Sequence, residues 1–198
     1  FSEFLGERIF EPLDMSDTSF TISDEKVPRL AANYERDQDK NLVLIDDPVE
    51  SIYADKRRLQ SGGGGLLSTT ADYAKFCEML LGGGKYNGCR IIGDRTLKMM
   101  CQNHLPMNAD LASVAMGSFS ETAYEGVGFG LGFASTLSEV KAHMLGEGDF
   151  YWGGMASTIF WVDPRESMFC VFMTQMVPSG TFNFRGQLKS IVYSAIED

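Results

Sequence analysis

A pair of glycines before a predicted strand is the feature of this sequence most able to do chemistry. Gly153 and Gly154 precede the apolar run 159–162, which leads into Asp163-Pro164 as a strand leads into a turn. Adjacent glycines leave the backbone uncovered, so a ligand carbonyl could accept hydrogen bonds from main-chain N–H groups, as in an oxyanion hole. Taken alone, however, these residues favour a plain bulge or a tight bend.

Other patterns that could carry chemistry are weaker. The cysteines at positions 77, 89, 101 and 170 form no C-x-x-C pair and no Cys/His cluster. This disfavours a zinc site and favours buried free thiols, with a disulfide left open. The only histidines are His104 and His143, and there is no G-x-S-x-G elbow, so a Ser-His-Asp hydrolase has little support. The glycine run 62–65 lacks the Lys-Ser/Thr ending of a phosphate-binding loop. No metal or cofactor is expected.

The N-terminal half is predicted to be mostly helix and irregular chain. Helical spacing of apolar residues predicts a helix over residues 1–9 that ends at Glu11-Pro12. Residues 16–60 are polar and rich in turn signals, which predicts a long excursion with at most short strands. The glycine run then leads to Thr69 and Asp72, which fit a capping box. The helix behind this box should bury a stripe made of Tyr73, Phe76, Cys77, Leu80 and Leu81.

The rest of the chain predicts one more short helix, a sheet and a C-terminal helix. The short helix should follow Asp94 as its N-cap and turn Leu97, Met100 and Cys101 inward. Residues 102–126 read as loop, whereas 129–134, 156–162 and 168–174 read as strands of an antiparallel sheet. A last helix should lie across that sheet through Phe184, Leu188, Ile191, Val192 and Ala195. The predicted class is α+β, an antiparallel sheet with packed helices.

Composition limits the classes of partner. The chain has 198 residues, a formal net charge of −10 and no basic patch, which argues against nucleic acid and anionic membrane surfaces as partners. Its apolar runs are too short for a membrane span. The compartment stays open.

Four segments together resemble the C-terminal half of the serine β-lactamase-like family, which includes class C β-lactamases, penicillin-binding proteins and related esterases. They are residues 4–18 (FLGERIFEPLDMSDT), 62–72 (GGGGLLSTTAD), 129–133 (FGLGF) and Trp152-Gly153-Gly154 with Asp163-Pro164. The resemblance implies a partial β-lactamase/transpeptidase-like fold, with residues 1–198 as a single C-terminal portion that lacks the part bearing the nucleophile.

The family's nucleophile is a serine in an S-x-x-K motif, with a Tyr in a Y-x-N-like motif nearby, and both normally precede the segment matched by Phe4. A serine hydroxyl needs a base to take its proton, and a lysine of lowered pKa can serve. The strings 23–26 and 138–141 fit S-x-x-K but are interpreted as chance matches with solvated lysines. In the first string, Asp24 and Glu25 should keep Lys26 protonated.

The resemblance also assigns the expected site residues. Trp152-Gly153-Gly154 takes the place of the K-T-G motif, so Gly154 and the backbone N–H of Met155 would form one side of the oxyanion hole. Trp152 and Gly153 would contact substrate, and Gln60, Ser61 and Gly62 fall where the family places a pocket wall. A lysine in the place of Trp152 would pair with a β-lactam carboxylate, so an apolar indole favours an ester or another uncharged acyl substrate. Trp152 could instead be a core aromatic, and the glycine run a plain loop before a helix.

The resulting hypothesis is part of a serine hydrolase that acts through an acyl-serine on small acyl or ester substrates. The alternatives are a β-lactamase or D-Ala peptidase-like activity, and a non-catalytic fragment or binding module. The expected partners are the missing N-terminal half or a second copy of the chain, either of which would cover a bare sheet edge.

Overall fold

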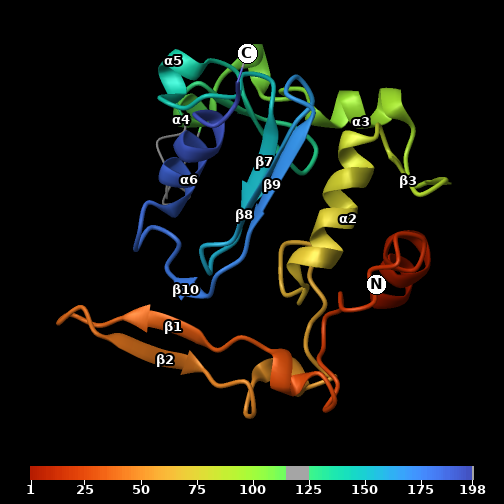
Figure 1. Ribbon diagram of the computed structural model, residues 1–198, viewed down its shortest axis with the longest axis vertical. Coiled ribbons are helices and arrows are strands. Elements are labelled where there is room, and N and C mark those ends of the chain that lie inside the picture. The colour runs from red at the N-terminus through yellow and green to blue at the C-terminus, as the bar shows by residue number, and fades with distance from the viewer. Residues whose placement is uncertain (115–124, 198) are drawn as a thin grey trace.

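The computed structural model of the chain describes residues 1–114 and 125–197. The expected punctuation at Gly117 and Ser118 lies outside the described residues. Figure 1 shows two parts: a helix–sheet unit, and below it an extended arm formed by two strands. The predicted α+β class and antiparallel sheet are confirmed. None of the helices in the described part of the chain has the length and apolar character of a membrane span.

A sheet with the strand order β5-β6-β7-β8-β9 forms the centre of the helix–sheet unit, and all its neighbouring strands are antiparallel. The strands are β5 (Val127–Phe129), β6 (Ala134–Thr136), β7 (Phe150–Gly153), β8 (Ile159–Asp163) and β9 (Met168–Phe172). All five residues of β8 are buried, because helices cover both faces of the sheet. The single strand expected at 129–134 is wrong. The chain reverses there, with the N–H of Gly130 donating to the carbonyl of Phe133, so two short strands replace one.

The helix α2 (Thr70–Leu81) packs against β8 and β9 on one face of the sheet. Its predicted N-cap is confirmed, since Thr69 Oγ1 accepts a hydrogen bond from the N–H of Asp72 at 3.1 Å. The main core forms between this helix and the sheet. Its buried apolar side chains include Cys77, Met79, Leu80, Phe150, Phe160 and Val162.

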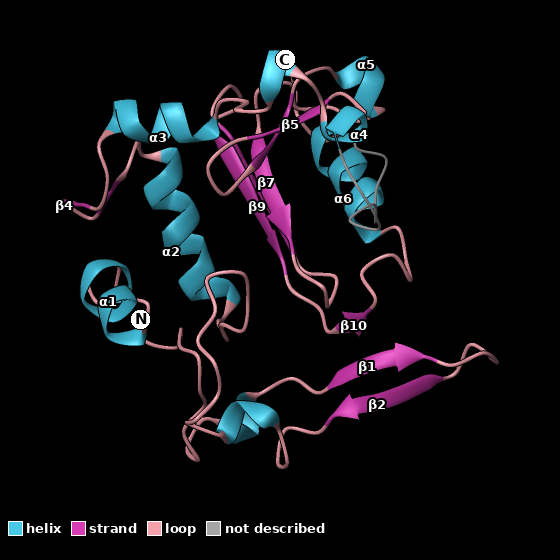
Figure 2. Ribbon diagram, turned by 180° about the vertical axis from the view of Figure 1, so that it is seen from behind, coloured by secondary structure: helices cyan, strands magenta, loops and turns pink. Residues whose placement is uncertain are grey.

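The helix α6 (Phe184–Tyr193) covers the other face of the sheet, as Figures 1 and 2 show from opposite sides. The C-terminal helix is therefore confirmed, but its predicted inner face is partly wrong. Ile191 is 65% exposed, whereas Lys189 is 2% exposed. The helix turns a charged side chain toward the sheet because that charge has a buried partner there, the carboxylate of Asp149.

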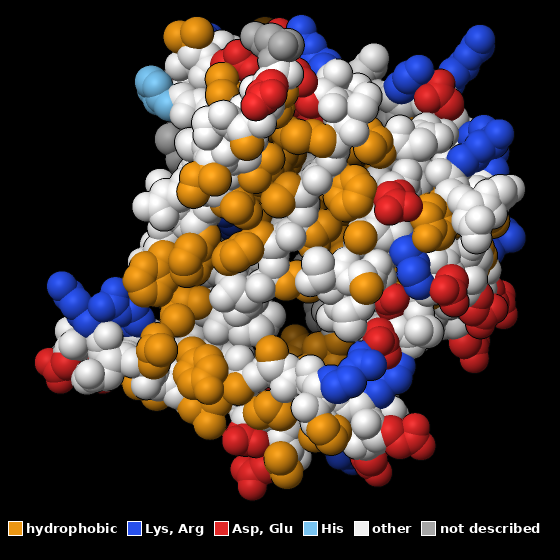
Figure 3. Space-filling view, viewed as in Figure 1, with side chains coloured by type: hydrophobic (Ala, Val, Ile, Leu, Met, Phe, Trp, Pro, Cys, Tyr) orange, Lys and Arg blue, Asp and Glu red, His pale blue; other side chains and the backbone are white. Residues whose placement is uncertain are grey.

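The arm is built from β1 (Asn33–Arg36) and β2 (Leu42–Asp46), which pair antiparallel. The short strand β10 (Met176–Val177) pairs parallel with β1 and so ties the arm to the chain between β9 and α6. The expectation of at most short strands in residues 16–60 is confirmed. Figure 3 shows apolar side chains along the arm and over the sheet, and Leu42, Val43, Leu44 and Ile45 on the arm are all exposed.

The remaining elements are short. The N-terminus forms α1 (Ser2–Leu5) and a π-helical turn (Gly6–Phe10), and 3₁₀ turns occur at Val27–Arg29, Ile52–Ala54 and Pro106–Asn108. The others are the β3–β4 hairpin (Lys85–Tyr86, Cys89–Arg90), α3 (Asp94–Cys101), α4 (Leu111–Val114) and α5 (Glu139–Ala142). Asp94 is the first residue of α3 and Gly93 is its N-cap, one residue before the prediction. The helix α4 interrupts the loop expected over 102–126. All four cysteines are free, and Cys77 alone is buried.

Candidate active site

The turn between β7 and β8 contains the predicted oxyanion segment. Trp152 pairs with Phe160 and Gly153 with Ile159. Beyond this register, the N–H of Gly154 donates to the carbonyl of Thr158 at 2.9 Å, which closes the turn. The turn residues 154–158 are therefore held at the end of a regular two-stranded ladder.

The expectation of a bare sheet edge at Trp152-Gly153-Gly154 is wrong for the strand as a whole. The strand β7 lies inside the sheet, between β6 and β8. Its pairing with β6, however, covers only Phe150 and Tyr151. Among the described residues, no strand pairs with Trp152 and Gly153 on the β6 side.

The strand β10 is hydrogen-bonded to the turn. The N–H of Met176 donates to the carbonyl of Ala156 at 3.1 Å, and Ser157 Oγ donates to the carbonyl of Met176 at 2.6 Å. Ser157 is fully buried and has a φ of 68°, a left-handed conformation that a non-glycine residue adopts only when its surroundings hold it there. These bonds fix the conformation of the turn.

The two glycines are required by close neighbours rather than by their own dihedral angles, since neither has a positive φ. A Cβ on Gly153 would overlap the guanidinium of Arg185, and a Cβ on Gly154 would overlap Thr158 Oγ1. Arg185 extends from α6 across the sheet face at Gly153, and its Nη2 donates to the carbonyl of Gly154 at 2.8 Å.

The direction of the Met155 N–H follows from this contact. The carbonyl of Gly154 accepts from Arg185 Nη2 and, at 3.2 Å, from the N–H of Ser157. In a trans peptide the C=O and the following N–H point in opposite directions, so the N–H of Met155 points away from Arg185. The side chain of Met155 is 72% exposed. That this N–H binds an oxyanion stays a prediction.

Trp152 lies on the sheet face that α2 covers, opposite Phe160, and is not a core residue. Its side chain is 37% exposed and meets Phe129 edge to face, with ring centroids 5.1 Å apart. The indole therefore offers apolar surface next to the turn, as a contact with an acyl group would require.

The predicted pocket-wall residues lie in the loop before α2. Gln60 Oε1 accepts a hydrogen bond from the N–H of Ser2 at 2.8 Å, and Ser61 Oγ accepts one from the N–H of Gly63 at 3.1 Å. Gln60, Ser61 and Gly62 are exposed. Both ribbon views place this loop and the β7–β8 turn at the same end of the helix–sheet unit. Within the described residues no hydrogen bond joins them, so their role as a wall stays a prediction.

The two S-x-x-K strings have structural roles. Lys26 Nζ lies 2.9 Å from Asp17 Oδ1 and donates to the carbonyl of Ser16, so Lys26 is ion-paired rather than solvated as expected. The pairing with Lys26 lowers the pKa of Asp17. Ser138 is the N-cap of α5, where its hydroxyl accepts from the N–H of Lys141 at 3.5 Å.

Sequence reasoning missed the polar side chains of α6. Arg185, Lys189 and Tyr193 recur at intervals of four, so they share one helix face, and that face meets the sheet. Lys189 Nζ lies 2.5 Å from Asp149 Oδ2, with both side chains at most 3% exposed. Apolar periodicity gives no signal for this face. The spacing of the three polar residues could have revealed it.

Further hydrogen bonds extend this ion pair. Thr136 Oγ1 donates to Asp149 Oδ1 at 2.7 Å, and the Tyr193 hydroxyl donates to Asp163 Oδ2 at 2.6 Å. Burial raises the pKa of Asp149, and this outweighs the opposite effect of Lys189. Burial and the neighbouring carboxylates likewise raise the pKa of Tyr193.

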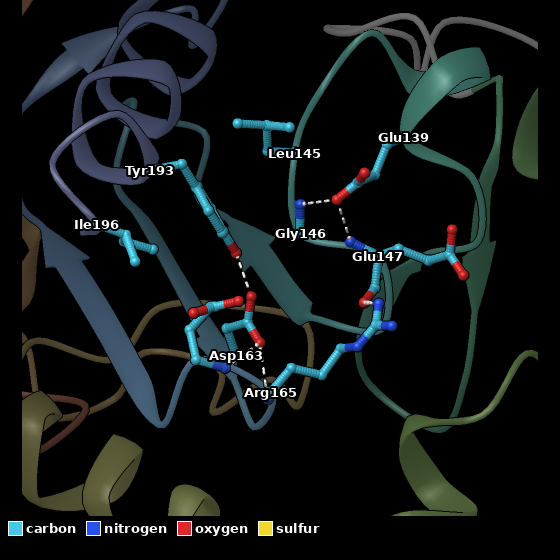
Figure 4. A pocket seen from close by; sticks show the side chains of 9 residues that line it. Glu139, Leu145, Gly146, Glu147, Asp163, Arg165, Tyr193 and Ile196 are labelled. Atoms are coloured by element: carbon cyan, nitrogen blue, oxygen red, sulfur yellow. Dashed lines mark hydrogen bonds between the residues drawn. The ribbon is translucent and has the colours of Figure 1, made fainter. Parts of the chain in front are cut away.

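A cavity of about 240 Å³ lies beside this network, at the sheet end opposite the β7–β8 turn (Figure 4). Its polar groups bond to one another. Glu139 Oε1 accepts from the N–H groups of Gly146 and Glu147, and Arg165 Nη1 donates to the carbonyl of Glu147. These bonds hold together the loops that line the cavity. No group of three or more His, Cys, Asp or Glu suited to a metal ion occurs within residues 1–114 and 125–197.

Comparisons with known proteins agree with this fold. The chain is 28% identical over 180 residues to the protein Rv1367c of Mycobacterium tuberculosis, covering 89% of this chain and 43% of that protein. Among solved structures, "EstCE1, a hydrolase with promiscuous acyltransferase activity" superposes with a TM-score of 0.76 at 25% identity, covering 97% of this chain and 50% of that one. A simvastatin synthase from Aspergillus terreus superposes with a TM-score of 0.75 at 19% identity, covering 98% and 52%.

The chain thus spans about half the length of the proteins it matches, the 43% of Rv1367c and the 50% of EstCE1. The beta-lactamase family profile matches residues 1–190, nearly the whole sequence. The chain belongs to the beta-lactamase family.

Proposed function

We propose that this chain supplies the oxyanion-binding turn and a pocket wall of a serine hydrolase that acts on esters or other uncharged acyl substrates through an acyl-serine. The observation that carries the proposal is the β7–β8 turn. The peptide between Gly154 and Met155 is fixed by hydrogen bonds to its carbonyl, and its N–H points the opposite way. Such a preorganised donor can stabilise the negative oxygen of a tetrahedral intermediate.

The substrate class follows from Trp152. Its partly exposed indole has no formal charge and so cannot pair with a substrate carboxylate as a lysine would. Apolar acyl or alcohol groups gain from contact with an aromatic face, which favours neutral esters. The acyltransferase activity named for EstCE1 supports the same acyl chemistry.

The nucleophile and its base belong, in this proposal, to a part of the protein outside residues 1–198. Within the chain, the lysines of both S-x-x-K strings are engaged or exposed, and Ser138 caps a helix. The partner that completes the site is therefore the N-terminal half of the same fold. A second copy of the chain is the alternative partner, but it would not supply the missing nucleophile and its base.

Active-site labelling of the natural gene product tests the proposal. A fluorophosphonate should form a stoichiometric adduct on a serine, and peptide mapping should place that serine outside residues 1–198. A neutral aryl ester should be turned over, and a penicillin should label the same serine more slowly. An adduct within residues 1–198, or no adduct, would refute the proposal. No adduct would favour a non-catalytic binding module, and faster penicillin labelling would favour a β-lactamase or peptidase.

A further inference from the structure

The side chain of Arg185 contacts the same peptide unit that carries the N–H of Met155. Its Nη2 donates to the carbonyl of Gly154 at 2.8 Å and lies 3.4 Å from the carbonyl of Thr158. The guanidinium is always charged, so the bond to Gly154 is charge-assisted and stronger than one from a neutral donor. A positive charge therefore sits on one end of the peptide whose other end faces the proposed oxyanion.

The chain makes room for this contact at Gly153. A side chain on Gly153 would overlap the guanidinium of Arg185, although the backbone of Gly153 would accept one, since its φ is not positive. The glycine is thus explained by the arginine.

The position of Arg185 in α6 also needs explaining. It is the second residue of the helix, where the helix dipole disfavours a cation. The first turn of α6 holds no acidic side chain to offset this cost. The carbonyl groups of the β7–β8 turn supply the compensating interaction.

From these contacts we infer that Arg185 is a positioning residue, which orients the Gly154–Met155 peptide and polarises it so that the Met155 N–H becomes a stronger hydrogen-bond donor. A hydrogen bond to a carbonyl draws electron density from the amide, and bonds in series strengthen one another in this way. The guanidinium does not touch the substrate. This inference rests on the proposed function, because it assigns the polarised N–H to the oxyanion.

One peptide group can be observed on its own in this chain. Gly154-Met155 is the only place in the sequence where Met follows Gly. Labelling with carbonyl-¹³C glycine and ¹⁵N methionine therefore gives a single HNCO peak, which reports the Gly154 carbonyl and the Met155 amide together. The other methionine amides in the same sample report whether the fold persists.

The expected result for Arg185→Met is an upfield shift of the ¹³C, ¹⁵N and ¹H frequencies of this peak, because the carbonyl loses its charged donor. Gly153→Ala should shift the peak in the same direction by displacing the guanidinium. The double variant should shift it no further than Arg185→Met alone. Arg185→Lys, which keeps the charge but not the planar fork, should lie between wild type and Arg185→Met.

Arg165→Met is the matched control, because Arg165 also donates to a backbone carbonyl, that of Glu147, at the other end of the sheet. It should leave the peak in place. A wild-type peak position in a folded Arg185→Met or Gly153→Ala variant would overturn the inference. So would an Arg185→Lys peak that coincides with that of Arg185→Met, since the charge would then have no effect.

This measurement needs no nucleophile, so the two proposals can fail separately. A shifted peak in a protein that forms no acyl adduct would refute the function and leave the Arg185 contact standing. An unshifted peak in a protein that does form the adduct would refute the role of Arg185 and leave the proposed function standing. Where both hold, Arg185→Met should lower kcat for an aryl ester by about tenfold with little change in KM, because the oxyanion exists only in the transition state.

Discussion

The two faces of the central sheet are held by different forces. On the α2 face, Phe150, Phe160 and Val162 pack against the apolar stripe of the helix in one continuous core. On the α6 face, a buried ion pair between Lys189 and Asp149 accompanies the buried side chains of Trp161 and Ile159. The ring of Phe172 also packs there against Phe184 of α6. One face of the sheet is thus closed by apolar packing, and the other by apolar packing together with a buried ion pair and its hydrogen bonds.

The difference shows what each face contributes. Apolar contacts stabilise without fixing direction, whereas hydrogen bonds and ion pairs do fix it. The polar network lies on the α6 face, where it holds α6 at a set position along the strands. The same helix carries Arg185 to the Gly154 carbonyl, so the ion pair at Lys189, one turn further along α6, also sets where that guanidinium lies.

The largest expected effect is on the apolar face. Phe160→Ala should lower the free energy of unfolding by about 4 kcal/mol, since it removes a ring that is 7% exposed and leaves a cavity beside Tyr73 and Phe133. Urea denaturation followed by circular dichroism measures it. Ile191→Ala, at a position 65% exposed on α6, is the control and should change stability by less than about 0.5 kcal/mol. A Phe160→Ala loss below about 1 kcal/mol would contradict the packed core.

The sequence predicts the apolar face much better than the polar one. The stripe of α2 has a regular period, so the element, its cap and most of its buried side could be read from residue types alone, although the buried Met79 is not in the predicted stripe. The α6 helix was also foreseen, but not that Lys189 faces inward, because a lysine counts as solvent-facing unless its partner is known. That partner, Asp149, lies forty residues away and meets it only through the fold.

The candidate site shows the same limit. The glycines Gly153 and Gly154, taken alone, favour a bulge or a tight bend, and the structure has a turn there. The edge position was wrong because residues 150–153, which lie between β6 and β8, were not predicted as a separate strand. The strands β5 and β6 were also read as one. Gly132, with a φ of 103°, allows the reversal that separates them. Arg185 was missed because nothing in a linear sequence links it to Gly153.

The next largest effect should come from breaking the ion pair. Lys189→Met should cost about 3 kcal/mol, because it leaves the Asp149 carboxylate buried without its cation. Adding Asp149→Asn should restore much of the loss, since a neutral amide needs no counter-charge and can still bond Thr136. Thermal and urea unfolding of the two single variants and the double variant measure this coupling. Additive losses would show that the pair is not coupled and that the two faces differ less than proposed.

Asp149 should also give an unusual pH dependence. Its folded-state pKa is raised above the ordinary 3.8, so at pH values between the two pKa values the folded state holds a proton that the unfolded chain has lost. Its contribution to stability is then complete below about pH 3.8 and is lost as the pH rises through the raised pKa, by about 1.4 kcal/mol for each pH unit between the two pKa values. The stability of wild type relative to Asp149→Asn should therefore fall from acidic to neutral pH. A difference that grows with pH would mean that Lys189 outweighs burial.

The smallest effect should come from Glu139, and it should have the opposite sign with pH. The N–H groups of Glu147 and Gly146 bond its carboxylate and hold its pKa below the ordinary 4.5. A lowered pKa stabilises the fold at pH values above the pKa of the unfolded chain. That stability is lost as the pH falls through the pKa of the folded state. Because solvent screens this partly exposed group, Glu139→Gln should cost less than about 1 kcal/mol at neutral pH and nothing in strong acid. Urea titrations of both proteins at several pH values decide it. If the difference in unfolding free energy between wild type and Glu139→Gln persists in acid, Glu139 acts through packing and not through its charge. Of the two carboxylates, only Asp149 would then contribute to stability through its charge.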